Sequence, residues 1–360
     1  MKEYSRRQKM LALCYISYYG ITFIGKDEKN ESRISGMIEK ALKTWKPING
    51  DWKLVWGPAV FALPATKFDD SMVYIAQNVK DPSKYTIVIR GTNPFSLPDW
   101  VIWDFQAENM KNWPFGEAKD SVKISESTSF GLMILQGLRP SVGDNIKEPK
   151  VSILEFLKSE LNSDTSTTLS DPKKKKIDLT VTGHSLGGAL APTLALWLKN
   201  IQAEELNKDV KISVVSFAGP TAGNKEFADF SNDCFKDNDL IDYDRVANSL
   251  DVVSHAWAEK DLKKLVKLYC PIFPGPILYF FIKKMIFTTK KNNYTAIQEN
   301  PTILEGKFKC WLPNYLLQAA YQHVLGYPEL LNISKDIDWF DLIKQNLFAR
   351  GKISDFICGK

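Results

Sequence analysis

Two periods of hydrophobicity alternate through the middle of the chain. Short apolar runs at residues 73–76, 85–89, 177–181 and 212–217, and near 245–247, predict β-strands. Apolar residues at helical spacing over 151–161, over 186–198 and around 227 predict helices between them. The resulting β-α-β-α-β succession predicts an α/β protein with a central, mostly parallel sheet and helices on both faces.

Three apolar stretches are candidates for membrane or export segments. Residues 10–25 follow a charged start, but aromatic residues fill their second half and no small-residue cleavage site follows, so we expect a helix packed on the core. Residues 179–198 contain polar residues and glycines, and residues 268–282 are broken by three prolines and a glycine. We therefore expect no transmembrane helix, and the compartment stays open between the cytoplasm and non-classical export.

The composition narrows the class of protein. The chain has 360 residues, 44% of them hydrophobic and 25% charged, which is typical of a globular protein and fits one domain over residues 1–360. Its five scattered cysteines contain no C-x-x-C pair, which argues against a disulfide framework or a cysteine-based zinc site and leaves a single disulfide bridge open. A net charge of +5, without a binding motif, does not favour a nucleic-acid partner.

The most informative segment is Gly-His-Ser-Leu-Gly at residues 183–187. It lies directly between a predicted strand and a predicted helix, the context that a nucleophile elbow requires. The sharp turn would expose the hydroxyl of Ser185, and the N–H of Leu186 would point toward an oxyanion formed on an attacked carbonyl. The alternative is a glycine-rich turn with an incidental serine.

Three segments, in order, resemble the class 3 lipases, the family of the filamentous-fungal triacylglycerol lipases. They are VTGHSLGGAL at 181–190, IVIRGT at 87–92 before an Asp-Trp pair, and FAGPTAGN at 217–224. The resemblance covers about residues 71–255 and resumes near the C-terminus. It implies an α/β-hydrolase fold and a serine ester hydrolase that acts on acyl esters of lipids without a metal or organic cofactor.

The resemblance also implies the remaining site residues. Asp251 matches the family's triad aspartate, His323 its histidine, and Thr92 would supply the second oxyanion-hole N–H beside Leu186. By chain order alone, His255 is also a candidate base, since serine, aspartate and histidine follow one another in this fold. Asp242 and Asp244 are expected to be a solvated pair before a strand.

Two segments are expected to cover the site. Residues 93–106 match the position of the family's lid, although their tryptophans could equally belong to the core. Residues 258–310 form a basic and aromatic insertion between Asp251 and His323, and residues 258–292 carry eight lysines and two acids. This insertion would either pack as a cap on the hydrolase body or contact an anionic membrane surface, and both roles are compatible.

The leading hypothesis is therefore a lipase-like serine ester hydrolase with Ser185, Asp251 and His323 as a catalytic triad. A phospholipase A1 that acts at an anionic membrane surface is the close alternative, because of the basic insertion. A catalytically silent interaction module on the same fold is a third reading. The natural substrate and the oligomeric state stay open at this point.

Overall fold

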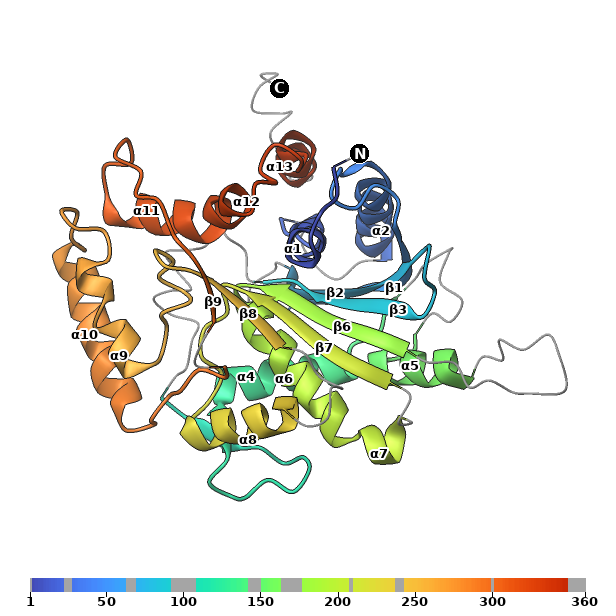
Figure 1. Ribbon diagram of the computed structural model, residues 1–360, viewed down its shortest axis with the longest axis horizontal. Helices are drawn as coiled ribbons and strands as arrows, with labels where there is room; N and C mark the ends of the chain where they lie inside the picture. The colour runs from blue at the N-terminus through green and yellow to red at the C-terminus, as the bar shows by residue number, and fades with distance from the viewer. Residues whose placement is uncertain are drawn as a thin grey trace, which may run out of the picture.

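A seven-stranded sheet forms the centre of the computed structural model, which describes residues 2–22, 28–62, 69–91, 108–141, 150–162, 177–206, 210–236, 243–298 and 301–348 (Figure 1). The strand order is β1-β2-β3-β6-β7-β8-β9, antiparallel from β1 to β3 and parallel from β3 onward. The strands are β1 (Trp52–Ala62), β2 (Asp69–Asn78), β3 (Lys84–Ile89), β6 (Ile177–His184), β7 (Val210–Phe217), β8 (Tyr243–Asn248) and β9 (Thr302–Leu304). A small separate ribbon pairs β4 (Met110–Asn112) with β5 (Lys123–Ser125). The predicted mostly parallel sheet is confirmed.

Helices cover both faces of this sheet (Figure 1). On one face lie α1 (Arg6–Ile16), α2 (Glu28–Thr44), α12 (Gly326–Leu330) and α13 (Trp339–Phe348). On the other lie α4 (Glu126–Gly137), α5 (Ile153–Asn162), α6 (Leu186–Asn200), α7 (Gln202–Glu205) and α8 (Lys225–Lys236). Alternate residues of β2 follow the same division, with Val73 and Ile75 in one core and Met72 and Tyr74 in the other.

The N-terminal helix α1 is buried against the sheet, as expected, but it begins earlier and ends sooner than residues 10–25. Ser5 caps it, and the Ser5 and Gln8 side chains form a reciprocal capping box. Every residue from Met10 to Ile16 is buried. The polar residues before Met10 thus belong to the helix, because the cap fixes where it starts.

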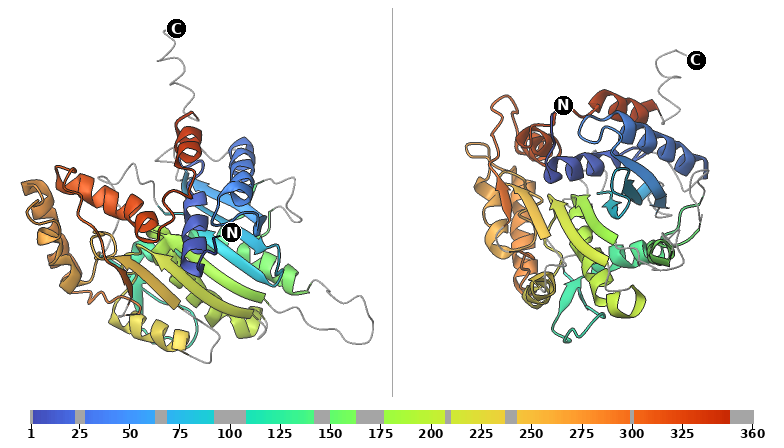
Figure 2. Two further views of the ribbon diagram at one scale, coloured as in Figure 1. Left: turned by 45° about the horizontal axis from the view of Figure 1, so that its top comes forward. Right: turned by 45° about the vertical axis from the view of Figure 1, so that its right-hand side comes forward.

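The described residues between Asp251 and His323 form short helices, turns and loops, together with β9. This segment contains α9 (Glu259–Leu262), the 3-10 turn η2 (Leu265–Lys267), α10 (Pro276–Lys290), α11 (Tyr315–Ala320) and the π-helical turn η3 (Tyr321–Leu325), gold to red-orange in Figure 2. The prolines that break residues 268–282 in sequence end at Pro276, which occupies the first turn of α10, where a proline is tolerated. Within the ranges given above, no helix has the length and apolarity that crossing a bilayer requires.

Candidate active site

Ser185 occupies a strained turn between β6 and α6. Its φ of 63° and ψ of −127° lie outside the regions that L-residues favour, at a cost of roughly 1–3 kcal/mol. The Ser185 side chain is buried, and its Oγ has no hydrogen-bond partner among the described residues. Leu186 begins α6, so its N–H precedes the first intrahelical hydrogen bond.

Glycines on both sides make the turn sterically feasible. A Cβ on Gly183 would lie 2.2 Å from the Gly187 carbonyl oxygen, and one on Gly187 would lie 2.2 Å from that of Ile89. A Cβ on Gly91, just after β3, would lie 2.8 Å from Ser185 Cβ. The end of β3 and the nucleophile elbow therefore touch through backbone.

Asp251 and His323 form a buried pair at the same edge of the sheet. His323 Nδ1 lies 3.0 Å and 3.1 Å from the two carboxylate oxygens of Asp251, although 72 positions separate the residues. His323 belongs to η3, and single π-helical turns are frequent at functional sites. Both side chains are almost inaccessible to solvent, so water does not compete for their hydrogen bonds.

Two further donors hold the Asp251 carboxylate. Tyr327 donates its hydroxyl to Oδ2 at 2.8 Å, and the Val253 N–H donates to Oδ1 at 2.9 Å. Burial by itself raises the pKa of a carboxyl group, but the His323 ring and these hydrogen bonds outweigh it and hold the pKa of Asp251 below its ordinary value. Asp251 is therefore ionised at neutral pH.

His184 packs against the His323–Asp251 pair. Its Nδ1 lies 2.8 Å from the Tyr18 hydroxyl, its Nε2 lies 2.9 Å from the backbone oxygen of His323, and the two histidine rings are 4.7 Å apart. Burial, and then the neighbouring His323, lower the pKa of His184 to about 3. The ring is thus neutral, with Nε2–H donating to the His323 carbonyl and Nδ1 accepting from Tyr18.

Sequence reasoning missed the roles of Tyr18 and Tyr327. Tyr327 lies four positions after His323, one helical turn away, which is a weak signal by itself. Tyr18 lies far from the other site residues in sequence, and only the packing of the N-terminal segment on β6 brings it to His184. No sequence pattern could have identified it.

The remaining candidates fall in different places. His255 Nδ1 lies 2.8 Å from the backbone oxygen of Asp251, not from its carboxylate. The prediction that Asp244 is a solvated residue before a strand is wrong. Asp244 lies within β8 and accepts a hydrogen bond of 2.6 Å from Arg7 Nε. Thr92, Asp242 and the whole of 93–106 lie outside the described residues.

The sheet order, the elbow after β6 and the two-sided helical cover define an α/β-hydrolase. The family described as Lipase (class 3) matches residues 86–260. The crystal structure of M37 lipase matches with a TM-score of 0.84 and 44% identity, over 94% of this chain and 96% of that chain. The chain therefore belongs to the class 3 lipase family, which places it among the carboxylic ester hydrolases.

Two plant proteins match over shorter segments. The triacylglycerol lipase OBL1 of Ricinus communis is 34% identical over 166 residues, which is 40% of this chain and 29% of that protein. The chloroplastic phospholipase A1-Ialpha2 of Arabidopsis thaliana is 37% identical over 79 residues, 21% of this chain and 16% of that protein. This chain thus matches less than a third of the length of either.

Proposed function

We propose that this protein hydrolyses acyl esters of lipids through Ser185, His323 and Asp251. The observation that carries the proposal is the buried His323–Asp251 pair, whose histidine ring lies 4.7 Å from the ring of His184, the residue before the strained, buried Ser185. Family membership supports the reaction class, since these are the residues that the class 3 resemblance assigns as a triad.

Each group has a defined step. Asp251 accepts the Nδ1–H of His323 and so makes Nε2 the nitrogen that takes the proton of Ser185. Ser185 Oγ attacks the ester carbonyl carbon, and the N–H groups of Leu186 and Thr92 stabilise the oxyanion. His323 then gives the proton to the departing alcohol, and water hydrolyses the acyl-enzyme with the same base.

The catalytic proposal is tested by single substitutions. Ser185→Ala should abolish both p-nitrophenyl ester turnover and labelling by a fluorophosphonate, while leaving the thermal midpoint within a few degrees of wild type. His323→Ala should lose activity by about 10⁴-fold or more, whereas the matched variant His255→Ala should retain most of it. Wild-type turnover in Ser185→Ala would refute the serine mechanism, and the opposite histidine result would move the base to His255.

For the substrate we propose a triacylglycerol-like ester, and phospholipase A1 activity at an anionic surface as the second candidate. The names of the two plant relatives support one reading each. The observation that favours the second candidate, phospholipase A1 activity, is the exposure of apolar side chains on the outer face of α10. On it Ile277, Phe280 and Phe287 are 85%, 73% and 82% exposed, with Lys284 between them.

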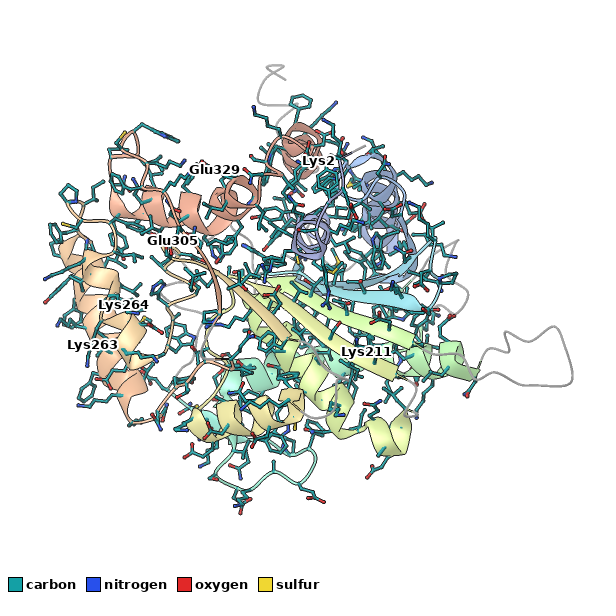
Figure 3. The ribbon with its side chains drawn as sticks, viewed as in Figure 1. Lys2, Lys211, Lys263, Lys264, Glu305 and Glu329 are labelled. Atoms are coloured by element: carbon teal, nitrogen blue, oxygen red, sulfur yellow. The ribbon has the colours of Figure 1, made fainter. Side chains whose placement is uncertain are left out.

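This outer face differs from the inner face of the same helix. Ile282, on the inner side, is buried in a cluster with Leu262, Tyr269 and Val253, next to Asp251. The two acids of residues 258–292, Glu259 and Asp261, pair with Lys263 and Lys264, labelled in Figure 3, at 2.6 Å and 2.7 Å. Aromatic residues exposed beside lysines suit the headgroup boundary of an anionic bilayer.

Vesicle flotation distinguishes the two substrate candidates when it is combined with a substrate panel. The triple variant Ile277→Ser, Phe280→Ser, Phe287→Ser should bind phosphatidylserine vesicles at least about tenfold more weakly than wild type, because three apolar side chains that the bilayer would take up are lost. Met133→Ser, exposed on α4, is the matched control and should bind like wild type. Equal binding of the triple variant would reject the membrane role, and hydrolysis of triolein but not phosphatidylcholine would reject phospholipase activity.

A further inference from the structure

A polar pocket lies where β3, β6 and β7 begin, at the end of the sheet opposite the candidate active site. Its volume is about 390 Å³, within the usual range for small-molecule sites. Asp178, which lines it, stands near the start of β6, whereas Ser185 follows the end of that strand. At about 3.3 Å per residue, these two positions are roughly 23 Å apart. The pocket is therefore separate from the site that contains Ser185, and Figure 3 shows Lys211, another of its lining residues, well apart from Lys263 and Lys264.

Positively charged side chains from three elements line this pocket. Arg6 and Lys9 belong to α1, Lys84 to β3 and Lys211 to β7. Asp178 is the single acid in the described lining, so four cations against one acid give a formal charge of +3. The helix α1 also begins here, and the positive end of its dipole adds to the potential. The pocket is therefore suited to an anion.

Acids outside the pocket neutralise only part of this charge. Lys84 pairs with Asp81 at 3.0 Å, and the Lys9 ammonium lies 3.8 Å from an Asp51 carboxylate oxygen. Both of these pairs are partly exposed to solvent, which screens them. The Lys211 side chain is exposed and makes no ion pair with any residue that the structure describes. Its ammonium group is therefore available to a ligand.

Buried hydroxyl groups add hydrogen-bonding capacity beside these cations. Thr180 and Ser213 are neighbours in the register of β6 and β7, both are buried, and their side-chain oxygens lie 3.1 Å apart. The Arg6 guanidinium donates to Ser213 Oγ at 2.5 Å, which holds this cation against the sheet. Asn78 accepts two backbone N–H groups through Oδ1, while its Nδ2 donates to no described residue. The pocket thus combines positive charge with N–H donors, as the binding of an oxyanion requires.

We propose that this pocket binds a small soluble anion that carries one or more phosphate groups. A polyvalent anion fits better than a single carboxylate, because four cations around one negative charge would still repel one another. Phosphate oxygens can accept hydrogen bonds from Arg6, Lys211 and Asn78 together, since each phosphate presents several acceptors. The anion is a free one rather than a lipid headgroup, because a bilayer that meets the Ser185 edge of the sheet leaves this edge roughly 23 Å away. The site goes beyond the proposed ester hydrolysis and does not depend on it.

Isothermal titration of the full chain with pyrophosphate, at fixed ionic strength, tests the site. Wild type should bind one pyrophosphate, and Lys211→Gln should weaken this binding at least about tenfold, because a charge-assisted hydrogen bond is lost. Lys119→Gln removes an exposed lysine outside the pocket lining, so this matched control should bind like wild type. Absence of binding to wild type, or equal affinities of wild type and Lys211→Gln, would overturn the proposal.

Thermal unfolding and vesicle flotation separate a phosphate site from a general basic surface. Pyrophosphate should raise the thermal midpoint of wild type and of Lys119→Gln, but raise that of Lys211→Gln less, because the ligand binds the folded state. Acetate at the same ionic strength should have no such effect, and equal stabilisation by acetate would show only screening of like charges. If Lys211→Gln reduced flotation with phosphatidylserine vesicles but kept its affinity for pyrophosphate, these cations would serve a membrane surface and the proposal would fail.

Discussion

At the scale of single residues, His184 makes hydrogen bonds that its position within the elbow does not predict. It donates to the backbone carbonyl of His323 and accepts from Tyr18, so a neutral ring supports the segment that carries the candidate base. Protonation would turn its acceptor nitrogen into a second donor facing the Tyr18 hydroxyl. Burial opposes that charge, which is why the pKa of His184 falls to about 3.

This pKa predicts how stability depends on pH. Between about pH 6.5 and 3 the unfolded chain binds a proton at residue 184 that the folded chain excludes, so the free energy of unfolding rises with pH in this window. The stability that depends on a neutral His184 is fully present above pH 6.5. It is lost as the pH falls, by at most about 1.4 kcal/mol per pH unit. When the free energy of unfolding is measured with urea between pH 4.5 and 7.5, its slope against pH should be shallower for His184→Gln than for wild type. Identical slopes would contradict the prediction.

The candidate site shows how far residue-level reasoning reaches. The elbow at Ser185 follows from five residues and their flanking periodicity, because a sharp strand-to-helix turn constrains its neighbours locally. Asp251 and His323 were selected by resemblance, and their roles stay predictions, although the structure brings their side chains within 3.0 Å. Tyr18 and Tyr327 depend on packing between distant segments, which no local pattern encodes.

At the scale of elements, the contact between β3, β6 and α6 depends on glycine. Gly187→Ala would place a methyl group 2.2 Å from the Ile89 carbonyl, which can move only with the sheet. We expect a loss of about 1–3 kcal/mol in stability and, because Ser185 shifts with the turn, at least about 100-fold in kcat/KM.

The matched control for this substitution lies in α2. Gly36 is exposed within the helix, and a Cβ there meets nothing within 4 Å, so Gly36→Ala should stabilise the protein by about 0.5–1 kcal/mol without changing activity. Thermal unfolding and p-nitrophenyl butyrate turnover measure both variants. A Gly187→Ala protein with wild-type activity would show that the elbow tolerates more room than the backbone contacts indicate.

The elements that periodicity missed have a common physical reason. β1 contains Gly57 and Pro58, which interrupt any alternating pattern, yet as an edge strand it pairs only with β2 and absorbs the interruption in register shifts. The predicted strand at 73–76 is only the apolar centre of β2, whose polar end at Gln77 and Asn78 pairs with β1. Pairing with a neighbour, rather than hydrophobicity, extends these strands.

At the scale of the whole molecule, the two ends of the described chain are joined over the sheet. Lys2 pairs with Asp336 at 2.9 Å, Lys40 pairs with Asp341 at 2.8 Å, and the Tyr19 hydroxyl donates to Asp341 at 2.7 Å. The two lysines are half exposed, so these ion pairs contribute little individually. The buried contacts of α1 beneath them contribute more, because this helix is part of one of the two layers that cover the sheet.

We therefore expect that the fold requires the segments outside residues 86–260. That segment contains the elbow and Asp251 but lacks α1, whose residues Met10–Ile16 are buried on the sheet, and it lacks β1, β2, β9 and η3. Removing them leaves one face of β6 and β7 in water, together with an unpaired Asp251 carboxylate that has lost both His323 and Tyr327.

We expect a fragment of residues 86–260 to show no cooperative thermal transition and strong binding of a hydrophobic dye, whereas the full chain melts cooperatively. A fragment of residues 1–260, which restores α1, β1 and β2, should recover ordered structure in part but no activity, because it still lacks the candidate base. Sharp melting of the short fragment would show that the layer containing α1 is dispensable, and that the buried contacts on this face add little to the stability of the sheet.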